Sequence, residues 1–242
     1  MKGTHRKERR SNRDNRHTSF AAVQHPEITE RREPRETGPL VGKNRNQERY
    51  LNAMASSTIV LGTGPAGVGK TYLAAAFAAK ELLDKNIDRI IVTRPAIEAG
   101  EEMGFLPGEI EEKFDPYLQP FLDVFHRRLG KSHTEALIKS GSIEAAPLAY
   151  MRGRTFRNAI VILDEAQNTT PEQMKMFLTR IGEGSTMIIN GDIRQSDLKG
   201  PNGLADALDR LEGIRGVRVV EFQRSDIVRH GIIQDIVEAY EA

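Results

Sequence analysis

The apolar residues of this chain fall into short runs that alternate with longer amphipathic or alanine-rich segments. Runs rich in β-branched residues predict buried strands, because strands covered on both faces of a parallel sheet carry few polar residues. Strands are expected over residues 58–61, 89–93, 143–146, 159–163, 186–190 and 217–222. Helices are expected over 46–54, 72–83, 117–129, 134–139, 203–211 and 225–240, with one more that begins after Thr170 and ends at Gly182. This alternation predicts an α/β fold with a doubly wound, mostly parallel sheet and helices on both faces.

The composition of the chain changes near residue 38. Residues 1–38 are rich in Arg, Glu, Asn and Pro, which predicts a disordered or extended arm ahead of a single domain over 39–242. The first 20 residues carry a net charge of +5, whereas the whole chain carries +1. A basic arm is typical of a nucleic-acid-binding tail, and a solvated terminus without a partner fits the same composition. Within the domain, a loop rich in Gly and Pro over 96–108 is expected to shape a site.

Several classes of function are excluded by composition. The chain contains no cysteine, which rules out disulfides, thiol chemistry and zinc sites built on cysteine. Its apolar runs are far shorter than a bilayer span, so we expect no membrane partner. The N-terminus lacks the apolar segment of a signal peptide, and a cytoplasmic protein is expected.

The segment between the first expected strand and the next helix matches the phosphate-loop pattern G-x-x-x-x-G-K-[ST]. A strand, a glycine loop and a helix in that order place backbone N–H groups and the positive end of a helix dipole around a polyphosphate. We expect Lys70 to reach the β- and γ-phosphates of ATP and the Thr71 hydroxyl to bind Mg²⁺. The alternative is a glycine-rich turn with a chance Lys-Thr pair, which the flanking strand and helix disfavour. The loop consists of Gly64, Pro65, Ala66, Gly67, Val68, Gly69, Lys70 and Thr71.

Two acidic residues follow the most apolar expected strand, at 159–163. Both should emerge at the carboxyl edge of the sheet, where the phosphate loop also lies. Asp164 is expected to hold Mg²⁺ opposite Thr71, because this ion prefers oxygen ligands. Glu165 is expected to polarise the water that attacks the γ-phosphate. The alternative is an ordinary acidic pair at a helix start.

Three further residues are candidates for catalysis. Gln195 follows the 186–190 strand, and its amide could hydrogen-bond both the γ-phosphate and the attacking water; a turn-stabilising loop is the alternative. Arg224 and Arg229 flank the start of the last expected helix. A guanidinium there could neutralise the transferring phosphoryl group, including from a neighbouring subunit. Surface ion pairing is the alternative for either arginine.

Several motifs together resemble known ATPases. Residues 164–167 with 191–195 resemble motifs of superfamily 1 helicases. The closer resemblance is to the PhoH-like family of P-loop ATPases, and it runs from residue 40 to the end. The motifs that carry it are residues 93–96, 98–101, 104–108, 150–155, 163–168 and 191–197.

This resemblance implies a single RecA-like core that hydrolyses ATP with Mg²⁺ and acts on RNA or single-stranded nucleic acid as a ring-shaped homo-oligomer, a hexamer. It also implies that Gln47, upstream of the phosphate loop, contacts the adenine. Arg94, Arg152 and Arg154 are candidates for contact with nucleic acid or phosphate. Ion pairs that fix loops are the alternative for these three arginines.

The domain has room for one such core, so a nucleic-acid motor would have to work across subunit interfaces. The alternative is a nucleotide-switched assembly or regulatory ATPase that acts on a protein partner without helicase activity. The absence of Trp and the aromatic content of 6% weigh slightly against a motor with aromatic stacking platforms. A small-molecule kinase ranks last, because the acidic pair favours water as the acceptor.

Overall fold

The computed structural model describes residues 36, 38–95 and 110–228, with the backbone alone for 110–117. Apart from residues 36 and 38, the arm expected over 1–38 lies outside the described residues. So does the loop expected over 96–108. The rest of the domain is described up to residue 228, which covers every expected strand.

In the described part of the chain, six strands form one sheet in which every pairing is parallel. Their order across the sheet is β3-β2-β4-β5-β1-β6, so β5 separates β1 from β4. The predicted parallel α/β sheet is confirmed, and its order agrees with the RecA-like interpretation. The strands are β1 (Ile59–Thr63), β2 (Arg89–Thr93), β3 (Ile143–Ala145), β4 (Ala159–Leu163), β5 (Thr186–Gly191) and β6 (Val217–Glu221).

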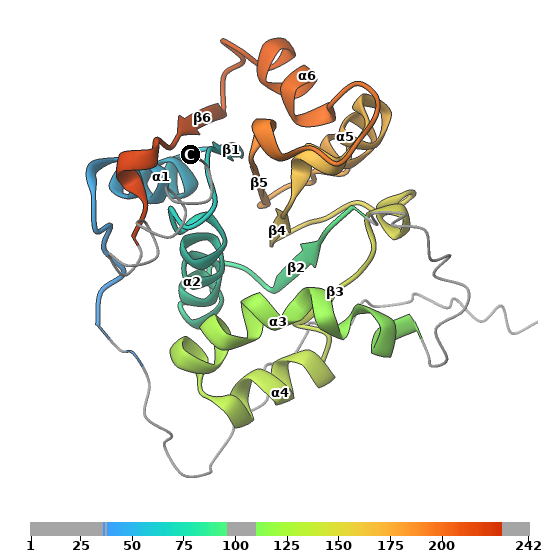
Figure 1. The fold of residues 1–242 in the computed structure, drawn as a ribbon. Coiled ribbons are helices and arrows are strands. Elements are labelled where there is room, and N and C mark those ends of the chain that lie inside the picture. The colour runs from blue at the N-terminus through green and yellow to red at the C-terminus, as the bar shows by residue number, and fades with distance from the viewer. Residues whose placement is uncertain (1–35, 37, 96–109, 229–242) are drawn as a thin grey trace, which may run out of the picture.

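Helices cover both faces of this sheet (Figure 1). One face packs against α1 (Arg45–Ser56), α2 (Lys70–Leu83), α3 (Ile110–Leu129) and α4 (Lys131–Lys139), and the other against α5 (Pro171–Leu178) and α6 (Gly203–Arg210). Because successive strand residues point to opposite faces, Ile90 and Val92 enter the first core and Ile91 the second. No helix in the described part of the chain has the length and apolarity that crossing a bilayer requires.

Short 3₁₀ helices follow four of the strands at their carboxyl ends. They are η2 (Leu148–Met151) after β3, η3 (Ala166–Asn168) after β4, η4 (Ile193–Gln195) after β5 and η5 (Arg224–Asp226) after β6. Helix α2 begins at the same edge, after β1 and the glycine loop. The topology therefore brings Lys70 and Thr71 of α2 to the same edge of the sheet as Asp164, Glu165 and Gln195.

Helix α5 begins as predicted but ends earlier. Thr170 and Gln173 form the expected capping box, with Pro171 at the first turn. The helix stops at Leu178 and not at Gly182, so the predicted end is wrong. The reason is tertiary: the carbonyl of Arg180 accepts the N–H of Phe156 at 2.9 Å, which draws the chain alongside residues 156–158.

The helix predicted over 225–240 does not begin where expected. Residues 224–226 form η5, and 227 and 228 are not helical; residues 229–242 lie outside the described part of the chain. The carbonyl of Asp226 accepts the side-chain amide of Asn44 at 3.1 Å. The N–H of Val228 donates to the carbonyl of Gly67 at 3.1 Å. These backbone groups are therefore used to hold the segment against α1 and the glycine loop.

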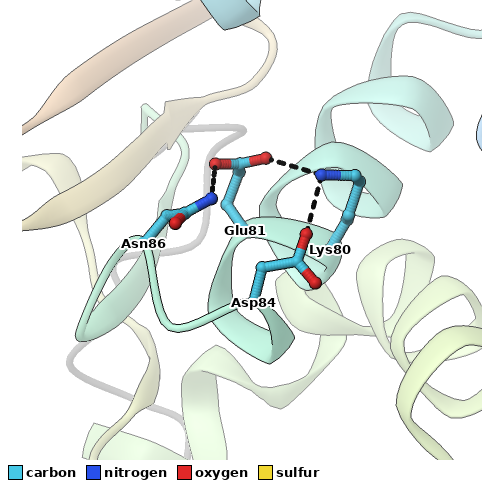
Figure 2. Close-up of polar contacts among 4 residues, drawn as sticks. All are labelled: Lys80, Glu81, Asp84 and Asn86. Atoms are coloured by element: carbon cyan, nitrogen blue, oxygen red, sulfur yellow. Dashed lines mark hydrogen bonds and ion pairs between the residues drawn. The ribbon is translucent and has the colours of Figure 1, made fainter.

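A polar cluster fixes the carboxyl end of α2, as Figure 2 shows. Lys80 Nζ donates to Glu81 at 3.1 Å and to Asp84 at 2.8 Å, and the Asn86 amide donates to the other Glu81 oxygen at 2.8 Å. Lys80 and Asp84 are half exposed, so their pair contributes about 0.3–0.5 kcal/mol. The cluster lies at the end of α2 opposite the glycine loop and stabilises the turn into β2.

Candidate active site

A pocket of about 290 Å³ opens at the carboxyl edge of the sheet, between the glycine loop and the ends of β4 and β5. It gathers most of the residues that the sequence singled out for phosphate, metal and catalysis. Gly64, Pro65 and Val68 shape the loop without lining the pocket. The lining residues are Ala66, Gly67, Gly69, Lys70, Thr71, Tyr72, Asp164, Glu165, Gly191, Asp192 and Gln195.

The glycine loop needs glycine for its path. Gly64 has φ of +131°, and a Cβ there would lie 2.4 Å from the carbonyl oxygen of Phe222. A side chain at this position would thus force the loop away from β6. Val68 anchors the middle of the loop in the core, where it is fully buried.

The loop leads directly into the first turn of α2. The cap residue Gly69 has no side-chain acceptor for the N–H groups of that turn. Uncapped N–H groups and the positive end of the helix dipole favour an anion at this point. Lys70 Nζ donates to the carbonyls of Gly64 and Pro65, the latter at 2.9 Å, so the ammonium lies across the loop.

Lys70 lies in a partly desolvated position beside acidic residues. Burial lowers its pKa, and the negative charges of Asp192, Asp164 and Glu165 oppose that shift. The ammonium group and the carboxylates therefore face one another across the pocket. Such an arrangement of one cation with acids suits a ligand that brings both phosphate and a divalent cation.

Asp164 and Thr71 form the oxygen donor set of the pocket. The Thr71 hydroxyl donates to the two carboxylate oxygens of Asp164 at 3.1 and 3.3 Å. A hydroxyl and a carboxylate in contact fit Mg²⁺, which takes one or two protein ligands together with phosphate oxygens and water. In the described part of the chain no group of three or more His, Cys, Asp or Glu side chains is placed to hold a metal.

Arg94 is the immediate partner of Asp164. Its guanidinium donates to Asp164 at 2.6 Å and lies 5.9 Å from the centre of the Phe121 ring. Burial raises the pKa of Asp164, and the ion pair with Arg94 opposes this shift. The sequence left two interpretations of Arg94, contact with nucleic acid or phosphate and an ion pair within the protein. The structure shows an ion pair, with Asp164.

Glu165 adopts an unusual backbone conformation beside the pocket. Its φ and ψ are 56° and 39°, in the left-handed region that non-glycine residues rarely occupy. Its carboxylate accepts a hydrogen bond from the side-chain amide of Gln167 at 2.7 Å, and the side-chain Oε1 of Gln167 accepts one from the N–H of Asp192 at 3.1 Å. Gln167 therefore connects the end of β4 to the end of β5. The sequence assigned Gln167 no role, although it stands within the motif 164–167.

Gln195 lies at the end of η4, exposed and on the rim of the pocket. Reciprocal hydrogen bonds hold the loop that follows: Asn168 donates to Asp197 at 3.2 Å, and the Asp197 N–H donates back to Asn168 at 2.9 Å. The Ser196 hydroxyl donates to the carbonyl of Gln167 at 3.0 Å. The Gln195 segment is thus fixed to the acidic segment after β4.

Gln47 lies beneath the glycine loop and does not line the pocket. Its amide donates to the carbonyl of Val68 at 2.8 Å and accepts the N–H of Lys43 at 2.8 Å. Gln47 is 4% exposed. The structure thus places it as a support of the loop, and its contact with adenine stays a prediction.

The remaining candidate arginines that the structure describes, Arg152, Arg154 and Arg224, do not line the pocket. Arg224 is exposed in η5, and Arg229 lies outside the described residues. Arg154 makes a two-point ion pair with Glu144 and lies 5.0 Å over the centre of the Phe156 ring, whereas Arg152 is exposed. The structure brings neither Arg152 nor Arg154 into the pocket.

Comparisons with known proteins identify relatives over most of the chain. Residues 39–241 match the family described as PhoH-like protein. The PhoH-like protein of Bacillus subtilis (strain 168) is 56% identical over 201 residues, which cover 82% of this chain and 63% of the relative. Protein PhoH of Escherichia coli (strain K12) is 52% identical over 213 residues, or 86% and 60% of the two chains. This chain therefore spans about three fifths of the length of these relatives. Among solved structures, a Pif1 helicase from Candida albicans is similar with a TM-score of 0.42 and 16% identity, over 82% of this chain and 43% of that one.

Proposed function

This chain belongs to the PhoH-like protein family, and from that premise we propose that it hydrolyses ATP with Mg²⁺ and couples hydrolysis to RNA or single-stranded nucleic acid. The observation that carries the proposal is the pocket where a phosphate loop at a helix N-terminus faces an acidic strand end. Lys70, Thr71, Asp164, Glu165 and Gln195 all line it. Each of these residues has a role in phosphoryl transfer to water.

The phosphates of ATP bind at the first turn of α2 in this proposal. The uncapped N–H groups after Gly69 donate to phosphate oxygens, and the helix dipole favours their negative charge. Lys70 exchanges its hydrogen bonds with Gly64 and Pro65 for the β- and γ-phosphates. An ammonium that already lies across the loop needs little movement to do this.

Thr71 and Asp164 are the residues that would hold Mg²⁺, directly or through water. When bound, the ion neutralises charge on the β- and γ-phosphate oxygens. Arg94 limits the negative charge of Asp164 and keeps its carboxylate in a fixed orientation through the 2.6 Å ion pair. The site thus has a carboxylate whose position does not depend on the ligand.

Water is the acceptor of the γ-phosphoryl group. Glu165 accepts a proton from the attacking water as the oxygen bonds to the γ-phosphorus, and ADP leaves as the bond to the bridging oxygen breaks. Gln167 orients the Glu165 carboxylate through the 2.7 Å hydrogen bond. Gln195, on the rim, hydrogen-bonds the γ-phosphate or the water.

Three parts of the proposal reach beyond the pocket. Arg224 or Arg229 supplies a guanidinium to the site of a neighbouring subunit in a homo-oligomer, a hexamer. Gln47 contacts the adenine as well as the loop. The arm over 1–38 and the surface arginines Arg152 and Arg154 contact the nucleic acid, for which positive charge on the protein is the main source of affinity.

The test is phosphate release with and without single-stranded RNA, for the wild type, Glu165→Gln and the control Glu172→Gln, an exposed acid in the first turn of α5. We expect Glu165→Gln to bind ATP as the wild type does but to lose hydrolysis, while Glu172→Gln retains both. Stimulation by RNA supports the nucleic-acid ATPase. A rate of hydrolysis that does not change with RNA supports the alternative, a nucleotide-switched ATPase that acts on a protein partner. Full hydrolysis by Glu165→Gln would refute the assigned role of Glu165.

A further inference from the structure

The segment after β3 exposes an aromatic side chain on a fixed backbone. In η2, Leu148 and Met151 are 2% and 0% exposed, whereas Tyr150 between them is 50% exposed. Among the described residues, Tyr150 is the only aromatic one of the large hydrophobic side chains that are exposed. The Tyr150 N–H donates to the carbonyl of Pro147 at 2.9 Å, and the N–H of Arg154 donates to the carbonyl of Met151 at 3.2 Å. The ring is therefore presented to solvent by a rigid turn.

The segment that carries this ring is positively charged. Residues 143–157 contain three arginines and one acid, Glu144. Arg154 neutralises Glu144 through its two-point ion pair. Arg152 and Arg157 are exposed, and they leave the segment with a net charge of +2. A half-exposed aromatic ring in a segment with exposed cations has the two elements of a site for single-stranded nucleic acid, which are a stacking platform and contacts to the phosphate backbone.

This surface is joined to the candidate active site by short connections. The N–H of Leu148 donates to the carbonyl of Arg94 at 3.3 Å. The guanidinium of Arg94 pairs with Asp164 at 2.6 Å. The surface therefore adjoins the residue that contacts the metal-binding carboxylate, at the carboxyl edge of the sheet.

We propose that Tyr150 stacks on a base of single-stranded nucleic acid while Arg152 and Arg157 contact its phosphates. The inference rests on the proposed function and specifies where the nucleic acid binds. A protein partner fits less well, because the other exposed residues of the turn are Ala149, Arg152 and Gly153, which offer little apolar area beside the ring. The low aromatic content of the chain and its lack of Trp do not count against this site, since one stacking platform needs a single aromatic residue.

The chain lacks tryptophan, which makes the test direct. Tyr150→Trp introduces the only tryptophan of the variant at the proposed platform, and its emission can be excited selectively over that of tyrosine. Val219→Trp introduces the only tryptophan of the control on β6, at the opposite edge of the sheet, where Val219 is 39% exposed. Each variant is titrated with oligouridylate at low salt. We expect a stacked base to quench the emission of the Tyr150→Trp variant, and the emission of the Val219→Trp variant to stay unchanged.

Affinity measured by fluorescence anisotropy of a labelled oligonucleotide gives the second readout. We expect Tyr150→Ala to weaken binding roughly ten- to a hundredfold, because base stacking on one aromatic ring accounts for about that factor. Tyr150→Phe retains the ring and should retain wild-type affinity. Circular dichroism of each variant checks that it is folded.

The outcomes separate this inference from the proposed function. Suppose that the wild type binds RNA, that oligouridylate leaves the Tyr150→Trp emission unquenched, and that Tyr150→Ala keeps its affinity. This result would overturn the inference and leave the nucleic-acid function intact. If the wild type binds no oligonucleotide at low salt, the inference and the proposed function both fail.

Discussion

Gln167→Leu should change the orientation of the Glu165 carboxylate without changing nucleotide binding, so it tests the two effects separately. Leucine has a similar size and removes both hydrogen bonds of the amide. One of them, at 2.7 Å, holds the Glu165 carboxylate, and the other, at 3.1 Å, satisfies the N–H of Asp192. Gln167 does not line the pocket, so the nucleotide loses no direct contact.

The magnitude follows from these two bonds. Gln167 is 3% exposed and Asp192 is 9% exposed, so the unpaired Asp192 N–H costs about 1–3 kcal/mol of stability. The Glu165 residue is exposed, so water replaces the lost hydrogen bond and stability changes little. The carboxylate loses its fixed orientation instead. A carboxylate displaced by about 1 Å from the attacking water lowers kcat between about tenfold and a hundredfold.

Steady-state hydrolysis measures kcat and KM for ATP, and chemical denaturation measures the free energy of unfolding. We expect kcat to fall, KM for ATP to stay within about twofold, and the free energy of unfolding to drop by about 1–3 kcal/mol. Gln119→Leu is the control, because Gln119 is exposed on α3. A wild-type kcat would refute the reasoning. A raised KM with unchanged kcat would mean that Gln167 acts on nucleotide binding.

Two more predictions follow from the loop and the core. Gly64→Ala should abolish ATP binding in a calorimetric titration, because its Cβ would lie 2.4 Å from the Phe222 carbonyl at a φ of +131°; Gly200→Ala, in open space, should bind normally. Burial raises the pKa of Tyr50 far above its ordinary value of 10.0. The protonated hydroxyl donates to Asn190, so its contribution to stability is present below pH 10.0 and is lost as the pH rises above that value. Chemical denaturation at increasing pH should show that the free energy of unfolding of the wild type falls above pH 10.0, and that it falls less in Tyr50→Phe. An equal fall in the two proteins would contradict the role of the Tyr50 hydroxyl.

Local patterns accounted for most of the sheet because β1, β2, β4 and β5 each carry a continuous run of at least three apolar residues. The run at Ala159–Leu163 is buried at every position, so its burial needed no knowledge of its neighbours. The capping box of α5 was also local, with both hydrogen bonds within residues 170–173. Features of this kind can be read from composition and spacing within a few residues.

The contacts that could not be predicted from the sequence join residues that lie far apart along the chain. Asp226 is held by Asn44 and Asn46, which lie 182 and 180 positions away, and this contact replaces the expected start of a helix. Gln167 reaches Asp192 over 25 positions. Arg94 was a candidate for contact with nucleic acid or phosphate, but its pairing with Asp164 depends on the register of β2 against β4.

The proposed function requires one pocket to bind ATP together with a divalent cation between Lys70 and Asp164. Calorimetric titration of the full chain with ATP, in the presence and in the absence of Mg²⁺, tests it directly. We expect saturable binding at one site per chain, with higher affinity when Mg²⁺ is present. No saturable binding up to about 1 mM ATP with Mg²⁺, the upper end of usual KM values, would contradict it.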